Sequence, residues 1–161
     1  MFRKMRRFKQ QISPEECVEV LKNAKRGVLS MMGEDGYPYG IPVSHWYNEE
    51  DGKIYFHGAK TGHKVDAIKA NEKVSFCVMD EGYREEGDWA LNIKSVVIFG
   101  RAGFIEFDKE PEKVREICVG LSAKFTDDPT YAETEIEKVG KNVLCIVITP
   151  DHMTGKLVNE A

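Results

Sequence analysis

The chain has 161 residues, of which 42% are apolar, 10% aromatic and 31% charged. This length fits one compact domain over residues 1–161, and no apolar run approaches the ~20 residues that a membrane-spanning helix needs. A formal charge of −4 argues against a general nucleic-acid binder. The charge is uneven, because residues 1–10 form a basic arm without acids. No apolar run follows this arm, so it does not read as a signal peptide.

The four cysteines are scattered along the chain and form no Cys-x-x-Cys pair. Each lies in an apolar or amphipathic segment, which is typical of free thiols packed as small hydrophobic side chains rather than of a zinc site or a disulfide framework. The cysteines therefore predict a cytoplasmic protein in a reducing environment.

Local patterns predict short strands with single helices between them. The first helix begins with the capping box Ser13-Pro14-Glu15-Glu16 and is expected to stop at Gly27. A second long helix is expected to be capped by Asp108, with Pro111 near its start. The predicted strands cover residues 27–32, 40–47, 53–58, 73–79, 92–107 and 142–149, and the other helices cover residues 62–70 and 130–139.

Prolines and glycines mark irregular positions in the predicted strands. Pro42, with Pro38 just before it, cannot donate a ladder hydrogen bond, so the second strand is expected at a sheet edge or a bend. Gly100 and Gly103 suit bulges in a curved sheet, and Pro150 is expected to end the last strand. The pattern predicts a mainly β (α+β) fold, a barrel or curved sheet with helical additions. Regular strand-helix alternation is missing, which disfavours a Rossmann domain.

The segment Gly58-Ala59-Lys60-Thr61-Gly62-His63-Lys64 is the most informative local motif. It leaves a strand and enters a helix, whose first N–H groups can bind phosphate, and Lys60 and Lys64 would add positive charge. It is not a P-loop, because three residues separate its glycines and His63 stands where that motif has lysine. The segment indicates either a phosphate site or a solvated basic turn.

Two histidines occupy neighbouring predicted strands. If the connecting hairpin centres near residue 50, His45 and His57 share one face of the sheet. Two imidazoles could ligate a metal, but no carboxylate or thiolate accompanies them at ligand spacing. Packing or hydrogen bonding beside a bound ligand is therefore favoured, and no metal is predicted.

Five runs of the chain stand out together by their order and spacing, at residues 39–47, 54–59, 62–64, 95–102 and 154–156. Together these runs resemble the pyridoxamine 5′-phosphate oxidase-like flavin-binding proteins. Within that family the chain is most similar to the 5-nitroimidazole resistance (Nim) branch, whose members often begin with Met-Arg-Arg, here Met5-Arg6-Arg7. The resemblance covers nearly the whole chain.

This resemblance implies a split β-barrel that binds FMN at a homodimer interface. The residues that it implies for the cofactor site are Pro42, Val43, Ser44, His45, Phe56, His57, Lys60, His63, Lys64, Ser95, Val96 and Val97. His63 and Lys64 are expected beside the phosphate with Lys60 assisting, and Ser95, Val96 and Val97 are expected at the dimer interface. The oxidase's C-terminal substrate-binding tryptophan and arginine have no counterpart, which disfavours vitamin B6 oxidation.

The implied function is that of a cytoplasmic FMN-dependent oxidoreductase of the Nim type. It would pass electrons from a donor such as a reduced nicotinamide to a small acceptor such as a nitroaromatic, with His57 as the candidate catalytic residue at the substrate face. The alternatives are a non-enzymatic flavin- or haem-binding carrier or sensor, with His45 or His57 as axial ligand, and a pyridoxamine 5′-phosphate oxidase-like activity. No nucleic acid or membrane partner is expected, and the basic arm is expected to pack near the acidic body or the dimer partner.

Overall fold

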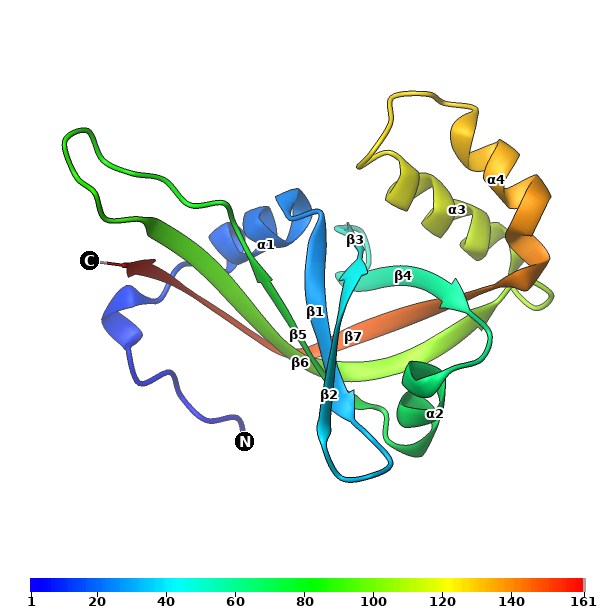
Figure 1. Ribbon diagram of the computed structural model, residues 1–161, viewed down its shortest axis with the longest axis horizontal. Coiled ribbons are helices and arrows are strands. Elements are labelled where there is room, and N and C mark those ends of the chain that lie inside the picture. Colours follow the sequence, from blue (N-terminus) through cyan, green and yellow to red (C-terminus); the bar gives the residue numbers. More distant parts are fainter. Residues whose placement is uncertain (161) are drawn as a thin grey trace.

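The computed structural model describes residues 1–160, and its core is one antiparallel sheet that curls into a half-barrel (Figure 1). The sheet order is β2-β1-β5-β6-β7-β4-β3. The strands are β1 (Arg26–Met32), β2 (Pro38–Ser44), β3 (Trp46–Asn48), β4 (Lys53–Ala59), β5 (Lys73–Met79), β6 (Asn92–Glu106) and β7 (Val143–Asn159). The helices are α1 (Pro14–Asn23), α2 (His63–Ala70), α3 (Pro111–Ser122) and α4 (Tyr131–Val139), with short 3-10 turns at Phe8–Gln10 and Gly140–Asn142. The predicted mainly β fold with helical additions is confirmed.

Helix α1 forms as its capping box predicts. The Glu16 backbone N–H donates to the Ser13 hydroxyl at 3.1 Å, and the Glu16 carboxylate accepts from the Ser13 backbone N–H at 3.0 Å. Its apolar stripe buries Cys17, Val20 and Leu21 against the sheet. The helix ends at Asn23, ahead of the predicted stop at Gly27, because the backbone is already extended at Ala24.

Strands β2 and β3 lie at the two ends of the sheet order although they follow one another in the chain. They are one strand-like segment broken at His45. Among the described strands, β2 pairs only with β1 before this break and β3 only with β4 after it. The single segment thereby connects both edges of the curled sheet. The predicted edge position of the strand that carries Pro42 is confirmed.

The last strand is much longer than predicted, because β7 runs through Pro150 to Asn159. The ladder between β6 and β7 pairs Gly100 with Pro150 and Phe99 with His152, so Asp151 is the extra residue of a bulge. The bulge takes up the missing N–H of proline without ending the strand. The predicted irregularity at Gly100 is confirmed, whereas Gly103 pairs regularly with Val147.

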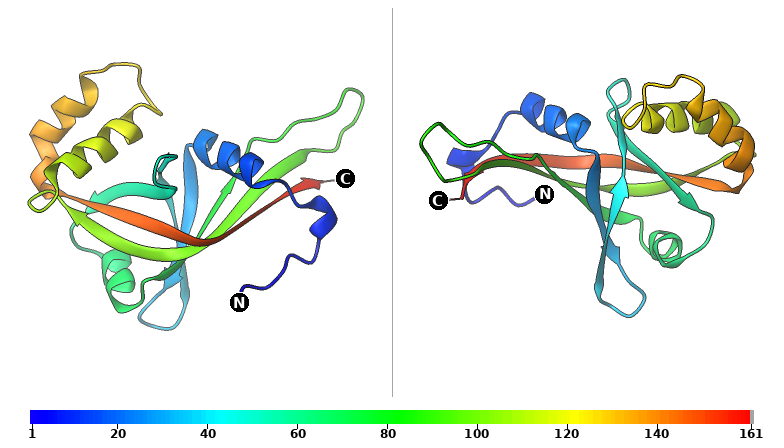
Figure 2. Two further views of the ribbon diagram at one scale, coloured as in Figure 1. Left: turned by 180° about the vertical axis from the view of Figure 1, so that it is seen from behind. Right: turned by 45° about the horizontal axis from the view of Figure 1, so that its top comes forward.

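Buried side chains form two clusters on opposite faces of the sheet. The larger cluster fills the curl beneath α1 and includes Leu21, Phe56 and Phe76. The smaller lies between α3 and the outer side of β4 and β7, and includes Tyr55 and Cys145. Figure 2 shows α3 and α4 together at one end of the molecule, with the N-terminal arm and the C-terminus at the other end.

The start of α3 differs from the prediction, and the basic arm packs against the sheet. The predicted cap Asp108 is wrong: the N-cap is Glu110, whose side chain makes no capping hydrogen bond, and Pro111 begins the helix. The arm lies along β7, where Phe2 stacks on His152 with ring centroids 4.6 Å apart. No helix in residues 1–160 combines the length and the apolar character needed to cross a membrane.

Candidate functional site

The strands β2 and β4 separate where a hairpin ladder would continue. Trp46 pairs with Tyr55, so a continued ladder would join His45 to Phe56 and then Ser44 to His57, but β2 turns instead to β1 and β4 to β7. A cavity of about 490 Å³ lies where they part. Its lining residues are Arg26, Pro42, Val43, Ser44, His57, Lys64, Leu121, Ser122, Phe125 and Tyr131. This volume is in the range of small-molecule sites, roughly 300–1,000 Å³.

Two strand edges face this cavity without a strand partner. Over its last residues β2 pairs only with β1, and beyond Tyr55 strand β4 pairs only with β7, among the strands that the structure describes. The N–H and C=O groups on the remaining side of each strand therefore have no ladder partner. Such groups can hydrogen-bond the polar edge of a planar ligand.

Lys64 lies at the start of α2, beside strand β4. Its ammonium is 5.9 Å from the centre of the Phe56 ring. A Cβ built on Gly58 would lie 2.6 Å from the Lys64 Nζ, so the glycine leaves the space that the lysine occupies. The N-cap residue of α2 is Gly62, with φ at 134°, and no side chain caps the helix. The first N–H groups of α2 and the Lys64 ammonium are thus both available to an anion.

The charge of the cavity is positive. Arg26 and Lys64 are the charged side chains among its lining residues, and no carboxylate is among them. Partial desolvation on the wall and the nearby Lys64 charge lower the pKa of His57. The imidazole is therefore neutral at neutral pH, and the cavity favours an anionic ligand.

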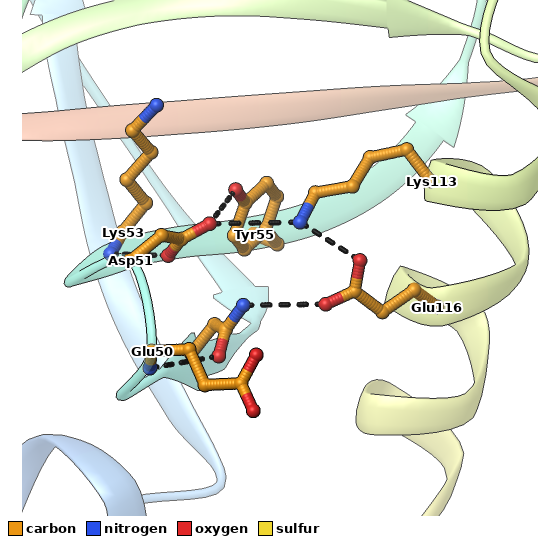
Figure 3. Close-up of polar contacts among 7 residues, drawn as sticks. Glu50, Asp51, Lys53, Tyr55, Lys113 and Glu116 are labelled. Atoms are coloured by element: carbon orange, nitrogen blue, oxygen red, sulfur yellow. Dashed lines mark hydrogen bonds and ion pairs between the residues drawn. The ribbon is translucent and has the colours of Figure 1, made fainter.

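Helix α3 closes one side of the cavity and is fastened to the hairpin β3–β4 by a polar network (Figure 3). The Tyr55 hydroxyl donates to the Asp51 carboxylate at 2.5 Å, and the Lys113 ammonium lies 3.5 Å from the same carboxylate and 2.9 Å from that of Glu116. The Asn48 amide donates to Glu116 at 3.3 Å. Desolvation and the bond to Asp51 raise the pKa of Tyr55 to about 12, so its hydroxyl keeps its proton.

A second fastening point follows the C-terminal end of α3. The Lys124 ammonium donates to the backbone carbonyls of Ala24 at 2.6 Å and of His45 at 2.5 Å. Burial lowers the pKa of Lys124 to about 8. The lysine ties the segment after α3 to the point where β2 becomes β3, next to the cavity.

Comparison with protein-family models identifies the fold family. The model described as pyridoxamine 5′-phosphate oxidase matches residues 13–157. The chain belongs to the pyridoxamine 5′-phosphate oxidase family. A comparison with curated protein sequences found no match.

Solved structures share the fold of this family member. A protein from Bacteroides thetaiotaomicron assigned to 5-nitroimidazole antibiotic resistance is 20% identical, with 92% of this chain and 87% of that chain covered and a TM-score of 0.75. An FAD-binding protein from Mesorhizobium loti is 21% identical over 92% and 97% of the two chains, with a TM-score of 0.71. An FAD- and haem-binding protein from Mycobacterium smegmatis is 18% identical over 94% and 74%, with a TM-score of 0.68. At these identities the likeness establishes the fold alone.

The cavity brings together five residues that the oxidase-family resemblance implied for the cofactor site. Pro42, Val43 and Ser44 line it from β2, His57 from β4 and Lys64 from α2. Whether they bind FMN stays a prediction. Their convergence follows from the separation of β2 and β4, because the residues that leave the hairpin ladder become the walls of the cavity.

The expectation that His45 and His57 share a face is wrong. The pair Trp46–Tyr55 places His45 opposite Phe56, on the inner face, and His57 on the other face. His45 is fully buried, and its Nε2–H donates to the Leu21 carbonyl at 2.8 Å. Burial and the Lys124 charge lower the pKa of His45 to about 4. His45 and Phe56 therefore support the cavity from within the core and do not line it.

The remaining predicted site residues lie outside the cavity lining. The His63 ring stacks on Tyr39 with centroids 4.0 Å apart, and Lys60 is exposed outside the cavity lining. Ser95 and Val97 are on the outer face of β6, and Val96 is in the core. Their implied roles at a dimer interface stay predictions.

Sequence reasoning missed the other half of the cavity. Arg26 comes from the start of β1, Leu121 and Ser122 from α3, Phe125 from the loop after it and Tyr131 from the start of α4. No local motif connects these positions, because only the packing of α3 and α4 beside β2 and β4 brings them together. One signal was present: Phe125 and Tyr131 are aromatic residues in a polar, charged stretch.

Proposed function

We propose that this chain is an FMN-binding oxidoreductase of the Nim type and that the cavity between β2 and β4 holds the cofactor. The observation that carries the proposal is the cavity's construction, in which two unpaired strand edges meet a cationic helix start at five of the positions that the family resemblance marks. The relatives named above as FAD-binding and as a nitroimidazole resistance protein support a flavin and this branch.

The residues of the cavity fit FMN chemically. A phosphate monoester carries a charge of about −1.5 to −2 at neutral pH, and the Lys64 ammonium with the uncapped start of α2 supplies the complement. The unpaired backbone groups of β2 and β4 would hold the polar edge of the flavin ring. When bound, FMN would supply the electron transfer, and the protein would bind and orient it.

A homodimer completes this proposal. Pro42, Val28, Cys77, Val97 and Thr154 lie opposite one another across four neighbouring strand pairs, so they form one row on the outer face of the sheet. The row begins at the cavity and is largely apolar, and Val28 is 43% exposed. A second copy of the chain on this face would bury the row and cover the mouth of the cavity.

The proposed reaction reduces a small acceptor at the expense of a reduced nicotinamide. With a nitroaromatic, a hydride from the nicotinamide and one proton reduce the nitro group to nitroso and release water, which accounts for two electrons. His57 lies on the cavity wall with a neutral imidazole, so its N–H can hydrogen-bond the acceptor oxygen or pass it a proton.

Spectroscopy and turnover test the proposal together. The purified protein is expected to show flavin absorption bands, to lose them when NADH or NADPH is added without oxygen, and to recover them on addition of a nitroimidazole. Flavin that no nicotinamide reduces would contradict the enzymatic proposal. Turnover of pyridoxamine 5′-phosphate would replace it with the oxidase activity.

A second candidate is a haem- or flavin-binding module without turnover. His57 favours it, because this imidazole is exposed at the cavity, whereas that of His45 is buried and donates to Leu21. The relative from Mycobacterium smegmatis named as FAD- and haem-binding belongs to this class. A Soret band in the purified protein that is lost in His57→Ala would favour the haem module over the oxidoreductase.

A further inference from the structure

The helical wall of the cavity has no role in flavin binding as proposed above. Apart from the residues of β2 and β4 and Lys64, which the proposal assigns to the flavin, the lining residues are Leu121, Ser122, Phe125 and Tyr131 from the helical side, with Arg26 from β1. The Phe125 and Tyr131 side chains are 47% and 48% exposed. Two half-exposed aromatic side chains on the wall of one cavity offer apolar area to a planar ring.

Arg26 stands beside one of these aromatic side chains. The Arg26 guanidinium carbon is 5.8 Å from the centre of the Phe125 ring, and Arg26 forms no ion pair with a described carboxylate. A guanidinium presents paired N–H donors that match the two oxygens of a carboxylate. The aromatic surface and the paired donors are thus adjacent on one wall.

The position of this wall is set by the fold. Lys124, next to Phe125 in the chain, donates to the carbonyls of Ala24 and His45 at 2.6 and 2.5 Å. At the other end of α3, Lys113 and Glu116 bind the hairpin β3–β4. Held at both ends, α3 keeps its lining residues at a fixed place relative to β2.

We propose that the helical wall is the acceptor site and that it selects planar aromatic acceptors bearing a carboxylate, with the ring against Phe125 and Tyr131 and the carboxylate on Arg26. The inference rests on the proposed function, since it places the acceptor beside a flavin held by β2, β4 and Lys64. It adds a substrate class, aromatic carboxylates, and three residues that determine specificity.

Matched ligands test the class. The titration uses 4-nitrobenzoate and its neutral analogue 4-nitrobenzamide, added calorimetrically to the flavin-loaded protein without any reductant. We expect the carboxylate to bind about tenfold more tightly than the amide, as a charge-assisted bidentate contact predicts. Equal affinities would overturn the proposal.

Variants test the residues. Arg26→Gln is expected to reduce the ratio of the two affinities to about twofold or less, because the amide loses no charged contact. Lys25→Gln is the matched control: the Lys25 ammonium is also 5.8 Å from the Phe125 ring, but Lys25 does not line the cavity, so the ratio should stay unchanged. Equal effects of the two variants would overturn the assignment of Arg26.

Flavin binding separates this inference from the proposal on which it rests. Phe125→Ala and Tyr131→Ala are expected to weaken both ligands by a similar factor while the affinity for FMN stays within about twofold. If Arg26→Gln loosened FMN about tenfold instead, Arg26 would serve the cofactor and the acceptor assignment would be wrong. Because the titration needs no turnover, a protein that fails to reduce nitro groups fails the proposed function without deciding the ligand class.

Discussion

The Lys64 ammonium occupies the space that a side chain on Gly58 would fill. A Cβ on Gly58 would lie 2.6 Å from Lys64 Nζ and 3.1 Å from its Cε. The lysine can lie beside β4 because Gly58, two residues after Phe56, has no side chain. The start of α2 therefore packs closely against this strand. The position of the Lys64 charge at the cavity therefore depends on Gly58, an uncharged residue of β4.

Gly58→Ala is expected to displace Lys64 and to weaken FMN binding roughly threefold to tenfold, because the ammonium must leave its position near the phosphate. Stability should change little, since only the flexible end of the lysine has to move. Fluorescence titration of FMN measures the affinity. Gly103→Ala is the control, because a Cβ at that strand glycine has 3.7 Å to its nearest neighbour. Identical FMN affinities in the two variants would contradict the placement of Lys64.

The outer face of the sheet is expected to carry the dimer. Val28→Glu places a charge within the apolar row, next to Pro42 at the cavity, so it should shift the protein to monomer and lower its flavin content. Val119→Glu is the matched control, because Val119 is similarly exposed, at 48%, but belongs to α3 and not to the row. Light scattering coupled to gel filtration gives the mass of each variant. A dimeric Val28→Glu variant would mean that another surface pairs the chains.

His45 is expected to make the protein sensitive to mild acid. The folded state holds the pKa of His45 at about 4 against an ordinary 6.5, so the unfolded chain binds the proton first as pH falls below 6.5. The free energy of unfolding should therefore decrease as the pH falls from 6.5 to about 4. At pH 5 the decrease should be on the order of 2 kcal/mol. Urea denaturation at pH 7 and pH 5 measures the change. His45→Phe should remove this part of the pH dependence, and an unaltered slope in that variant would assign it to other groups.

The network between hairpin β3–β4 and α3 is expected to contribute to stability through Tyr55. Tyr55→Phe removes the hydroxyl that donates to Asp51 and should lower the free energy of unfolding by about 1 kcal/mol, the usual contribution of such a bond. Tyr37→Phe is the control, because the Tyr37 side chain is exposed in the β1–β2 turn. Urea denaturation compares the two variants. Equal stabilities would mean that the Tyr55 hydroxyl adds nothing to the contacts that Asp51 makes with Lys113 and with the Lys53 backbone N–H.

The sequence predicted the parts of the fold that depend on near neighbours in the chain. The capping box at Ser13 and Glu16 is decided by a few consecutive residues and is confirmed, and Gly100 correctly indicated where the ladder of β6 is irregular. The prediction that the last strand ends at Pro150 was wrong. Whether a proline ends a strand or lies beside a bulge depends on the strand that pairs with it, and Gly100, which pairs with Pro150, is distant in the chain.

The candidate site was predicted in one half only. The half of the cavity formed by β2, β4 and α2 lies in segments whose residue order resembles the family. Ser44, His57 and Lys64 could therefore be predicted from the sequence. The shared face of His45 and His57 was misjudged because one residue of difference in hairpin register exchanges the two faces. The helical wall needed the packing of α3 and α4, which no local pattern carries.

The cavity between β2 and β4 is proposed to bind FMN through Lys64. The most direct measurement is a titration of FMN into wild-type protein and Lys64→Ala, followed by quenching of flavin fluorescence. We expect saturable binding of one FMN per chain, weakened by about 1–3 kcal/mol in the variant, as the loss of a charge-assisted contact requires. An absence of quenching, or an affinity that Lys64→Ala leaves unchanged, would contradict it.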